Sequence, residues 1–366
     1  MPILLFSVLL VLLLGLPLLG VLLQGADPSR YLEFPPLTRY VQHADFSWFV
    51  FIVLALGIAA VVSPFVFRVF AFGRPPVARS RKKSFPWWGW AGLALTAAAW
   101  CLAWTRFPWF AWGQPFTFPF IWLGYILTIN AWTFRRTGSC LLQRSPAGFG
   151  LLFPVSMVFW WFFEYLNRFV QNWYYVGIQE FSSLEYVFYA SLSFATVLPA
   201  VLGTRELLLS TGVFQAEFGR FRSLNPGRPK LLATAVLILA CTGLALIGTF
   251  PDLLFPLLWV APLLILISLL TLMGRKHILA PLRHGDWSLV LASACAALIC
   301  GFFWEMWNVY SLAKWEYSIP YVQRFHLFEM PLLGYAGYLP FGLECAVVAE
   351  AFLGSLVQGA RPSMRR

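Results

Sequence analysis

The sequence is divided into ten long apolar runs, and this pattern limits the possible folds more than any other feature of the chain. The runs cover residues 3–23, 46–72, 87–106, 116–134, 149–167, 185–207, 231–250, 254–274, 287–308 and 328–353. A helix needs about 20 mostly apolar residues to cross a bilayer. Only 11% of the residues are charged, whereas soluble domains carry about 25%. The pattern predicts an all-α integral membrane protein with about ten transmembrane helices.

The first run allows two interpretations. Residues 3–23 have no basic segment before them and continue into Gly25, Ala26 and Asp27. We favour an uncleaved first span, and a cleaved signal peptide is the alternative.

Basic residues collect in alternate loops. The loops after the second, fourth, sixth and eighth runs, together with Arg68 and the C-terminus, hold 20 of the 26 Lys and Arg residues. The positive-inside rule places these loops and both termini in the cytoplasm, with the chain in the cytoplasmic (inner) membrane of a bacterium. This distribution also accounts for the net charge of +11 without a nucleic-acid partner. The expected partners are membrane lipids and a lipid substrate.

The chain repeats itself at offsets between 141 and 147 residues. Phe163-Glu164-x-x-Asn167 recurs as Trp304-Glu305-x-x-Asn308, and Trp173-x-Tyr175 recurs as Trp315-x-Tyr317. We infer a duplicated four-span unit. Because four is even, the two copies keep the same orientation, and sites in such proteins lie at the repeat interface. The predicted parts are two N-terminal spans (1–73), a first repeat (84–207), a second repeat (227–353) and a basic cytoplasmic tail (354–366).

Four glutamates are the candidate catalytic residues: Glu164, Glu185, Glu305 and Glu329. By the predicted orientation, all four lie toward the non-cytoplasmic side of the membrane. A carboxylate within a span is costly, and such residues usually face the bundle interior and mark a site. If the four converge, a protonated carboxyl can donate a proton and an ionised one can accept it. The pattern predicts a general acid–base site.

The residues around these glutamates are candidates for substrate binding. They are Asn167, Asn308, Trp160, Trp161, Trp304, Trp307, Tyr310 and His326. We expect the two asparagines to orient the carboxylates and the aromatic faces to stabilise a cation. No nucleotide-binding or nucleophile motif is present, so we expect no cofactor. A metal site built from His326 and the glutamates is the alternative that the sequence leaves open.

These motifs resemble those of a known enzyme family. Trp304-Glu305-x-x-Asn308, followed by Leu327-Phe328-Glu329-Met330-Pro331, resembles the acidic motifs of small integral-membrane lycopene cyclases. Membrane-bound terpene cyclases similarly use an acidic residue beside an aromatic one on two spans. The chain departs from the cyclases in two ways. Each repeat has four spans rather than about three, and Tyr186 and Met330 stand where the cyclases have a second Glu.

The resemblance implies an intramembrane acid–base enzyme, of the cyclase or isomerase type, that acts on an isoprenoid or another lipid. A proton-coupled transporter is the first alternative, because parallel repeats and intramembrane carboxylates also suit a carrier. A non-catalytic membrane subunit or assembly factor is the second.

Overall fold

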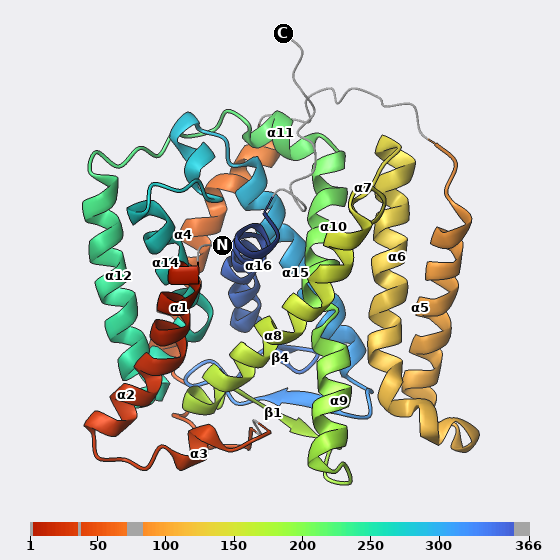
Figure 1. Ribbon diagram of the computed structural model, residues 1–366, viewed down its shortest axis with the longest axis horizontal. Helices are drawn as coiled ribbons and strands as arrows, with labels where there is room; N and C mark the ends of the chain where they lie inside the picture. The colour runs from red at the N-terminus through yellow and green to blue at the C-terminus, as the bar shows by residue number, and fades with distance from the viewer. Residues whose placement is uncertain (1–2, 36–37, 72–82, 355–366) are drawn as a thin grey trace.

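A helix occupies each of the apolar runs. The structure is a computed structural model that describes residues 3–35, 38–71 and 83–354, and most of these residues are helical (Figure 1). Six described helices are long and apolar enough to cross a membrane: Trp48–Phe70, Pro146–Val170, Ser183–Ser210, Pro229–Leu246, Ser288–Asn308 and Leu332–Leu353. Two shorter apolar helices are Ser7–Leu23 and Leu257–Leu272. The chain therefore has the fold of a mostly helical protein suited to a membrane.

The N-terminal part and the first half have the following elements. They are α1 (Ile3–Leu10), η1 (Val11–Gly15), α2 (Leu16–Leu23), α3 (Ser29–Leu32), α4 (Trp48–Ala71), α5 (Trp87–Thr105), η2 (Pro108–Phe116), α6 (Thr117–Thr137), α7 (Leu141–Arg144), α8 (Pro146–Val170), β1 (Trp173–Val176), α9 (Ser183–Phe194) and α10 (Val197–Ser210). The predicted runs 87–106 and 116–134 correspond to α5 and α6.

The rest of the chain is also mostly helical. Its elements are α11 (Val213–Phe218), α12 (Pro229–Leu246), α13 (Pro251–Leu254), α14 (Leu257–Leu272), η3 (Ala280–His284), α15 (Ser288–Asn308), β2 (Lys314–Tyr317), β3 (His326–Leu327), β4 (Met330–Pro331), η4 (Leu332–Gly337) and α16 (Tyr338–Leu353). Of the segments predicted to be cytoplasmic, the loop residues 74–82 and the tail residues 355–366 lie outside the described residues.

Local sequence signals set the ends of the helices next to the site. α8 begins with Pro146 at its first position, where the missing N–H costs nothing. It ends at Gln171, whose φ of 52° turns the chain into β1. α6 ends at Gly138, where a φ of 81° favours glycine. Arg135 and Arg136 in its last turn complement the negative end of the helix dipole.

The two halves, residues 84–207 and 227–353, pack in corresponding ways. α5 packs against α6 as α12 packs against α14, and α8 packs against α9 and α10 as α15 packs against α16. Contacts of α10 with α15 and of α8 with α16 then join the halves. The third and fourth helices of the two halves therefore form the centre of the molecule.

Two short antiparallel strands connect the halves at one end of this centre. Trp173 pairs with Tyr317, Tyr174 with Glu316, Tyr175 with Trp315 and Val176 with Lys314. The pairing is symmetric about Tyr174 and Glu316, since Trp173-x-Tyr175 and Trp315-x-Tyr317 exchange places across it. Side chains alternate between the two faces of a strand. The two Trp-x-Tyr pairs therefore share the inner face of this small sheet.

The N-terminal spans cover the outside of the two halves. In α4, the half-buried residues Phe51, Leu54, Ile58 and Phe65 form one helical stripe, and most of the other residues are exposed. This helix therefore contacts the body along a single face and leaves an apolar surface suited to lipid. α2 packs closely against α12.

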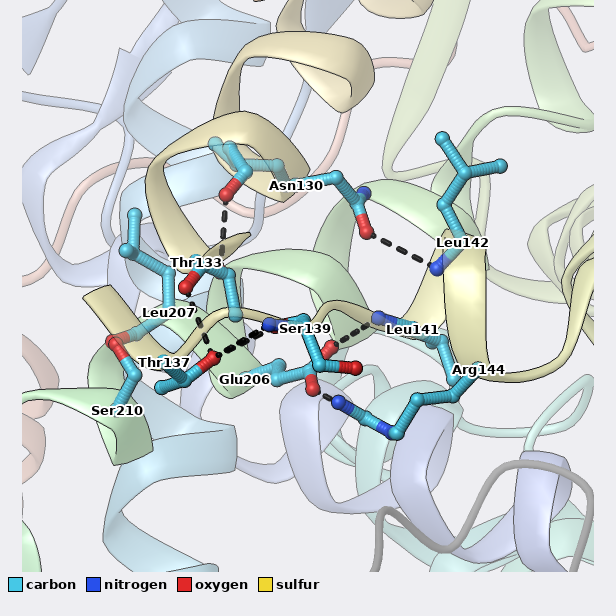
Figure 2. A network of polar contacts seen from close by, with 11 residues as sticks. Asn130, Thr133, Thr137, Ser139, Leu141, Leu142, Arg144, Glu206, Leu207 and Ser210 are labelled. Atoms are coloured by element: carbon cyan, nitrogen blue, oxygen red, sulfur yellow. Dashed lines mark hydrogen bonds and ion pairs between the residues drawn. The ribbon is translucent and has the colours of Figure 1, made fainter. Parts of the chain in front are cut away.

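The two ends of the bundle carry different structures. α3, β1 and β4 lie at the lower end in Figure 1, and α7 and α11 lie toward the upper end. At the upper end, a polar network ties α7 to α6 and α10 (Figure 2). Glu206 pairs with Arg144 and accepts from the Leu141 amide at 2.8 Å, while Asn130 accepts from the Leu142 amide at 3.3 Å. Glu206 thus has the structural role of pairing with a basic loop.

Candidate active site between the two halves

A cavity of about 350 Å³ lies between the halves, next to the inner face of the sheet. We call it the inner cavity. Its walls come from α6, α8, β1 and α9 of the first half and from α14, α15, β2 and α16 of the second, with Leu54 and Ile58 of α4 closing one side. Small-molecule pockets measure about 300–1,000 Å³ and are mostly apolar with few polar groups. The inner cavity matches this description.

Glu164 is fully buried behind the cavity wall of the first half. Its Oε1 accepts hydrogen bonds from the Tyr175 hydroxyl at 2.7 Å, from the Trp160 indole at 3.0 Å and from the Trp173 indole at 3.1 Å. All three donors line the inner cavity. Oε2 has no hydrogen-bond partner among the described residues. This carboxyl group is therefore linked to the cavity by hydrogen bonds from three aromatic residues of the cavity wall.

Glu305 is fully buried in the corresponding place of the second half. Its Oε1 accepts from the hydroxyls of Tyr317 and Tyr338, each at 2.7 Å, and both phenols line the cavity. The Trp315 indole donates to the Tyr317 hydroxyl at 2.9 Å. Oε2 of Glu305, like that of Glu164, lacks a partner in the described part of the chain.

The phenols of the strands keep their protons near neutral pH. Burial, followed by the neighbouring Glu164 carboxyl, raises the pKa of Tyr175 well above its ordinary value. Burial and the neighbouring Glu305 raise the pKa of Tyr317 in the same way. A phenol can both donate and accept a hydrogen bond, whereas an indole can only donate. The phenols are therefore the groups that can pass a proton between a carboxyl group and a molecule in the cavity.

Aromatic rings form most of the remaining wall. The ring centroid of Trp304 lies 6.0 Å from that of Tyr338, in a stacked pair, and 6.4 Å from that of Trp160. Trp259 stacks on Trp173 with 5.5 Å between ring centroids. Such faces attract a cation placed over them. The site thus combines proton carriers with surfaces that stabilise positive charge.

Asn167 and Asn308 hold the strands and do not contact the carboxylates, which corrects the expected role. Asn167 donates to the Trp173 carbonyl at 2.8 Å and accepts from the Asn172 amide at 2.8 Å. Asn308 donates to the Trp315 carbonyl at 2.7 Å and accepts from the Trp315 amide at 2.9 Å. A buried side-chain amide can form hydrogen bonds with backbone N–H and C=O groups on the strand edge that does not face the partner strand. The asparagines therefore place the aromatic residues that in turn contact Glu164 and Glu305.

Glu185 does not converge with the other carboxylates. It is exposed, and it forms a capping box with Ser182 at the start of α9. The Ser182 amide donates to Glu185 at 2.9 Å. The Ser-x-x-Glu spacing is typical of a helix capping box, so this role could have been predicted from the sequence.

Glu329 also lies outside the cavity. Its carboxylate pairs with Lys314 at 2.8 Å on the outer face of the sheet. Lys314 pairs as well with Glu316 at 3.1 Å. The carboxyl groups that hydrogen-bond to the cavity wall are therefore Glu164 and Glu305, and the expected convergence of four is wrong for Glu185 and Glu329.

The predicted aromatic residues divide into two groups. Trp160 and Trp304 line the cavity. Trp161 donates to Ser191 at 2.9 Å behind the wall, Trp307 is buried against Trp122, and Tyr310 is 60% exposed. None of these last three lines the inner cavity.

His326 is exposed, within 3.3 Å of the Gln323 amide nitrogen. The alternative metal site is not assembled, because among the described residues no three His, Cys, Asp or Glu side chains lie close enough to hold an ion.

Tyr175, Tyr317 and Tyr338 are site residues that were not predicted from the sequence. The repeated Trp-x-Tyr motif was visible, and its period of two could have indicated that both aromatics face one side of a strand. Tyr338 had no such signal, because no corresponding tyrosine occurs in the first half.

Comparisons of the chain with family models, with curated proteins and with solved structures find no match.

Proposed function

We propose that the chain is an intramembrane acid–base enzyme that rearranges an isoprenoid or another unsaturated lipid, as a cyclase or isomerase does. The observation that carries this proposal is the pair of buried carboxyl groups, each joined through a phenol to one aromatic cavity. The resemblance to membrane-bound cyclases supports the same class of reaction. The chemistry requires no nucleotide cofactor.

Both hydrogen-bond partners of Glu305 Oε1 are phenols, which can relay a proton, so we assign Glu305 as the general acid. When Glu305 is protonated, its hydrogen bond to Tyr338 reverses, and the phenol can pass a proton to an alkene carbon in the cavity. A C–H bond forms and a carbocation remains, which the faces of Trp304 and Trp160 stabilise.

Glu164 has the partners of a general base. Two indoles and a phenol donate to its Oε1, and such donors stabilise a negative charge. Tyr175 takes a proton from a carbon next to the cation and passes its own proton to Glu164, and the C–H electrons form a double bond. The lipid gains one proton and loses one. Return of the proton from Glu164 to Glu305 completes the cycle.

The proposed membrane arrangement follows the sequence analysis. We infer ten spans, both termini in the cytoplasm and a duplicated four-span unit. The symmetric pairing of β1 with β2 and the matching contacts of Asn167 and Asn308 support the duplication. The separation of α3 and β1 from α7 and α11 (Figure 1) supports the alternation of sides.

Comparative lipid mass spectrometry tests the function. A host strain that lacks the gene is complemented with wild type, Glu164→Gln, Glu305→Gln or Glu185→Gln at equal protein levels. Glu185→Gln is the matched control, because Glu185 caps a helix outside the cavity. We expect wild type and the control to convert one lipid into an isomer of the same mass. Each cavity variant should lose about 10²–10⁴-fold in the rate of this conversion, as for general acid–base residues.

Two results would contradict the proposal. If the folded cavity variants give the wild-type lipid profile, the carboxylates do no lipid chemistry. If wild type leaves every lipid unchanged but carries a proton-dependent flux in vesicles, the protein is a carrier, for which the cavity between the halves is equally suited.

A further inference from the structure

A second pocket lies directly beside the inner cavity. This outer pocket, of about 450 Å³, is lined by residues of the segment after α3, by β1 and by the start of α9. Tyr175, Ile178, Phe181 and Tyr186 line both spaces. The two spaces therefore share one wall, and a single long molecule could occupy both by displacing these side chains.

The outer pocket has a different chemistry from the inner cavity. Thr38, Arg39, Gln179 and Ser183 contribute polar groups to its lining. Arg39 is the one charged side chain among the described residues that line it. The inner cavity suits a hydrocarbon chain, whereas the outer pocket suits a polar group.

Two buried hydroxyls of the outer pocket lack partners. Thr38 is 6% exposed and Tyr186 is 5% exposed, and neither hydroxyl has a hydrogen-bond partner in the described parts of the chain. Leaving a buried hydroxyl unsatisfied costs free energy. Each such group calls for an explanation, and a ligand that displaces the side chains over these hydroxyls and bonds to both would provide it.

Among the described residues, the charged side chain at the outer pocket is Arg39, and its guanidinium is free to contact a ligand. Arg39 lies 3.9 Å from Glu33, and the two side chains are 77% and 48% exposed. Such an exposed pair contributes little stability, so the guanidinium can turn to a ligand. Guanidinium and hydroxyl groups together are typical ligands of a phosphate or carboxylate.

A buried arginine holds this part of the chain in place. Arg168 of α8 is 3% exposed and donates to the carbonyls of Glu33 and Pro35, the latter at 3.0 Å. Its charge also acts on Tyr186 and Glu164. Arg168 thus holds the backbone of Glu33 and Pro35, and it adds positive charge behind the shared wall.

We propose that the outer pocket binds the phosphate-bearing headgroup of an amphipathic lipid whose hydrocarbon chain lies in the inner cavity. The inference rests on the proposed function, because it names the substrate class of that site as a prenyl phosphate or diphosphate. Arg39 and the hydroxyls of Thr38 and Tyr186 bind the headgroup. The chain passes the shared wall and ends toward Leu54 and Ile58 of α4.

Binding to the full-length protein in lipid nanodiscs tests the assignment. The probes are farnesyl diphosphate, farnesol, which has the same chain without the charge, and inorganic pyrophosphate. We expect Arg39→Gln to weaken farnesyl diphosphate binding about tenfold, as for loss of a charged partner. Farnesol binding should stay within about twofold. Thr38→Val should act in the same direction, and Glu33→Gln, the matched control, should not weaken either probe.

The outcomes separate this inference from the proposed function. If farnesyl diphosphate and farnesol respond equally to Arg39→Gln and Thr38→Val, or if neither probe binds, the headgroup assignment is overturned. Pyrophosphate that binds as tightly as farnesyl diphosphate would also overturn it, because the ligand would then be the free anion. If the expected binding pattern appears while the lipid profile does not depend on Glu164 or Glu305, the headgroup site stands and the enzyme function falls.

Discussion

Glu164 and Glu305 occupy corresponding places in the two halves, yet different residues hold them. Each accepts a 2.7 Å hydrogen bond from the tyrosine of its own strand, Tyr175 or Tyr317. The further donors differ. Glu164 receives two indole N–H groups, from Trp160 and Trp173, whereas Glu305 receives a second phenol at 2.7 Å. The first half therefore has one group that can relay a proton, and the second half has two.

A glycine explains the exchange of donors. Gly301 follows Trp160 by 141 residues, the offset that also relates Glu164 to Glu305. A Cβ atom at Gly301 would lie 2.4 Å from the Tyr338 ring. The missing side chain thus provides the space that Tyr338 fills. In the first half, Trp160 fills the corresponding space and Phe194 packs on it, with 6.0 Å between the rings.

One repeated frame can therefore surround its two carboxyl groups with different donors. The helix, the asparagine and the strand are the same in both halves, so each carboxyl group is placed alike. The donor at one further position decides whether the carboxyl group is surrounded by groups that only donate or by groups that also relay.

Removing the strand phenols gives the largest expected effect and tests the comparison directly. Tyr175→Phe removes the one phenol on Glu164, so we expect turnover to fall by about 10²-fold or more. Tyr317→Phe leaves Tyr338 on Glu305, so the loss should be about tenfold, which is smaller than for removal of a general acid or base. Turnover is measured by the lipid assay in matched membranes. Equal losses for the two variants would show that the second phenol of the second half does not matter.

Filling the space at Gly301 should be the next largest change. Gly301→Ala places a methyl group against the Tyr338 ring, and overpacking a core costs about 1–3 kcal/mol. We expect a lower unfolding temperature and a turnover like that of Tyr338→Phe. Gly150→Ala is the control, because nothing lies near an added Cβ there. A Gly301→Ala protein with normal turnover would contradict the explanation of the exchange.

The two asparagines should differ in the stability that they provide. Asn167 accepts from two backbone amides, those of Asn172 and Trp173, whereas Asn308 accepts from one. Each buried group left unsatisfied costs about 1–3 kcal/mol. We therefore expect Asn167→Ala to lower the free energy of unfolding more than Asn308→Ala, as measured by denaturant unfolding in detergent. The opposite order would show that the 3.4 Å bond to Trp173 contributes nothing.

The smallest effect concerns the outer face of the sheet, where the halves also differ. Partial burial tends to raise the pKa of Glu316. Hydrogen bonds from Tyr174 and Lys314 outweigh this effect and hold the pKa of Glu316 below its ordinary 4.5. A lowered pKa stabilises the fold above pH 4.5, and this contribution is lost as the pH falls through the pKa of the folded state. Tyr174, the partner in the first half, is a neutral phenol at these pH values.

We therefore expect the unfolding temperature of wild type to fall by a small amount below pH 4.5. Glu316→Gln should remove that part of the pH dependence and leave the rest of the profile intact. An identical profile for both proteins between pH 3 and pH 7 would show that this ion cluster does not stabilise the sheet.

Much of the fold was open to prediction from the sequence. The apolar runs coincide with helices because partitioning into a membrane depends on consecutive residues and needs no distant partner. The prediction that Glu164 and Glu305 face the interior also agrees with their burial. An ionisable residue within an apolar span has few other places to lie. The count of ten spans and the duplication stay predictions.

The site residues could be predicted only in part. Glu185 and Glu329 look like Glu164 and Glu305 in the repeat, yet the structure places them on the surface. For Glu185 the local capping signal could have decided this, because its partner Ser182 is three residues away. For Glu329 it could not, because Glu329 lies in the turn between β3 and β4 and its partner Lys314 comes from β2, 15 residues away.

The amino-acid sequence is sufficient to predict that this protein is built of membrane-suited helices and that Glu164 and Glu305 are buried in them. Both properties follow from the composition of single segments, because the transfer of a segment out of water is local and nearly additive. The hydrogen-bond partners of those carboxylates depend on the tertiary structure. The donors to Glu164 lie 4 to 11 residues away, whereas those to Glu305 lie 12 and 33 residues away. Hydrogen bonds require partners within about 3 Å. Packing of α16 and the paired strands brings those partners together, and no segment contains that information alone.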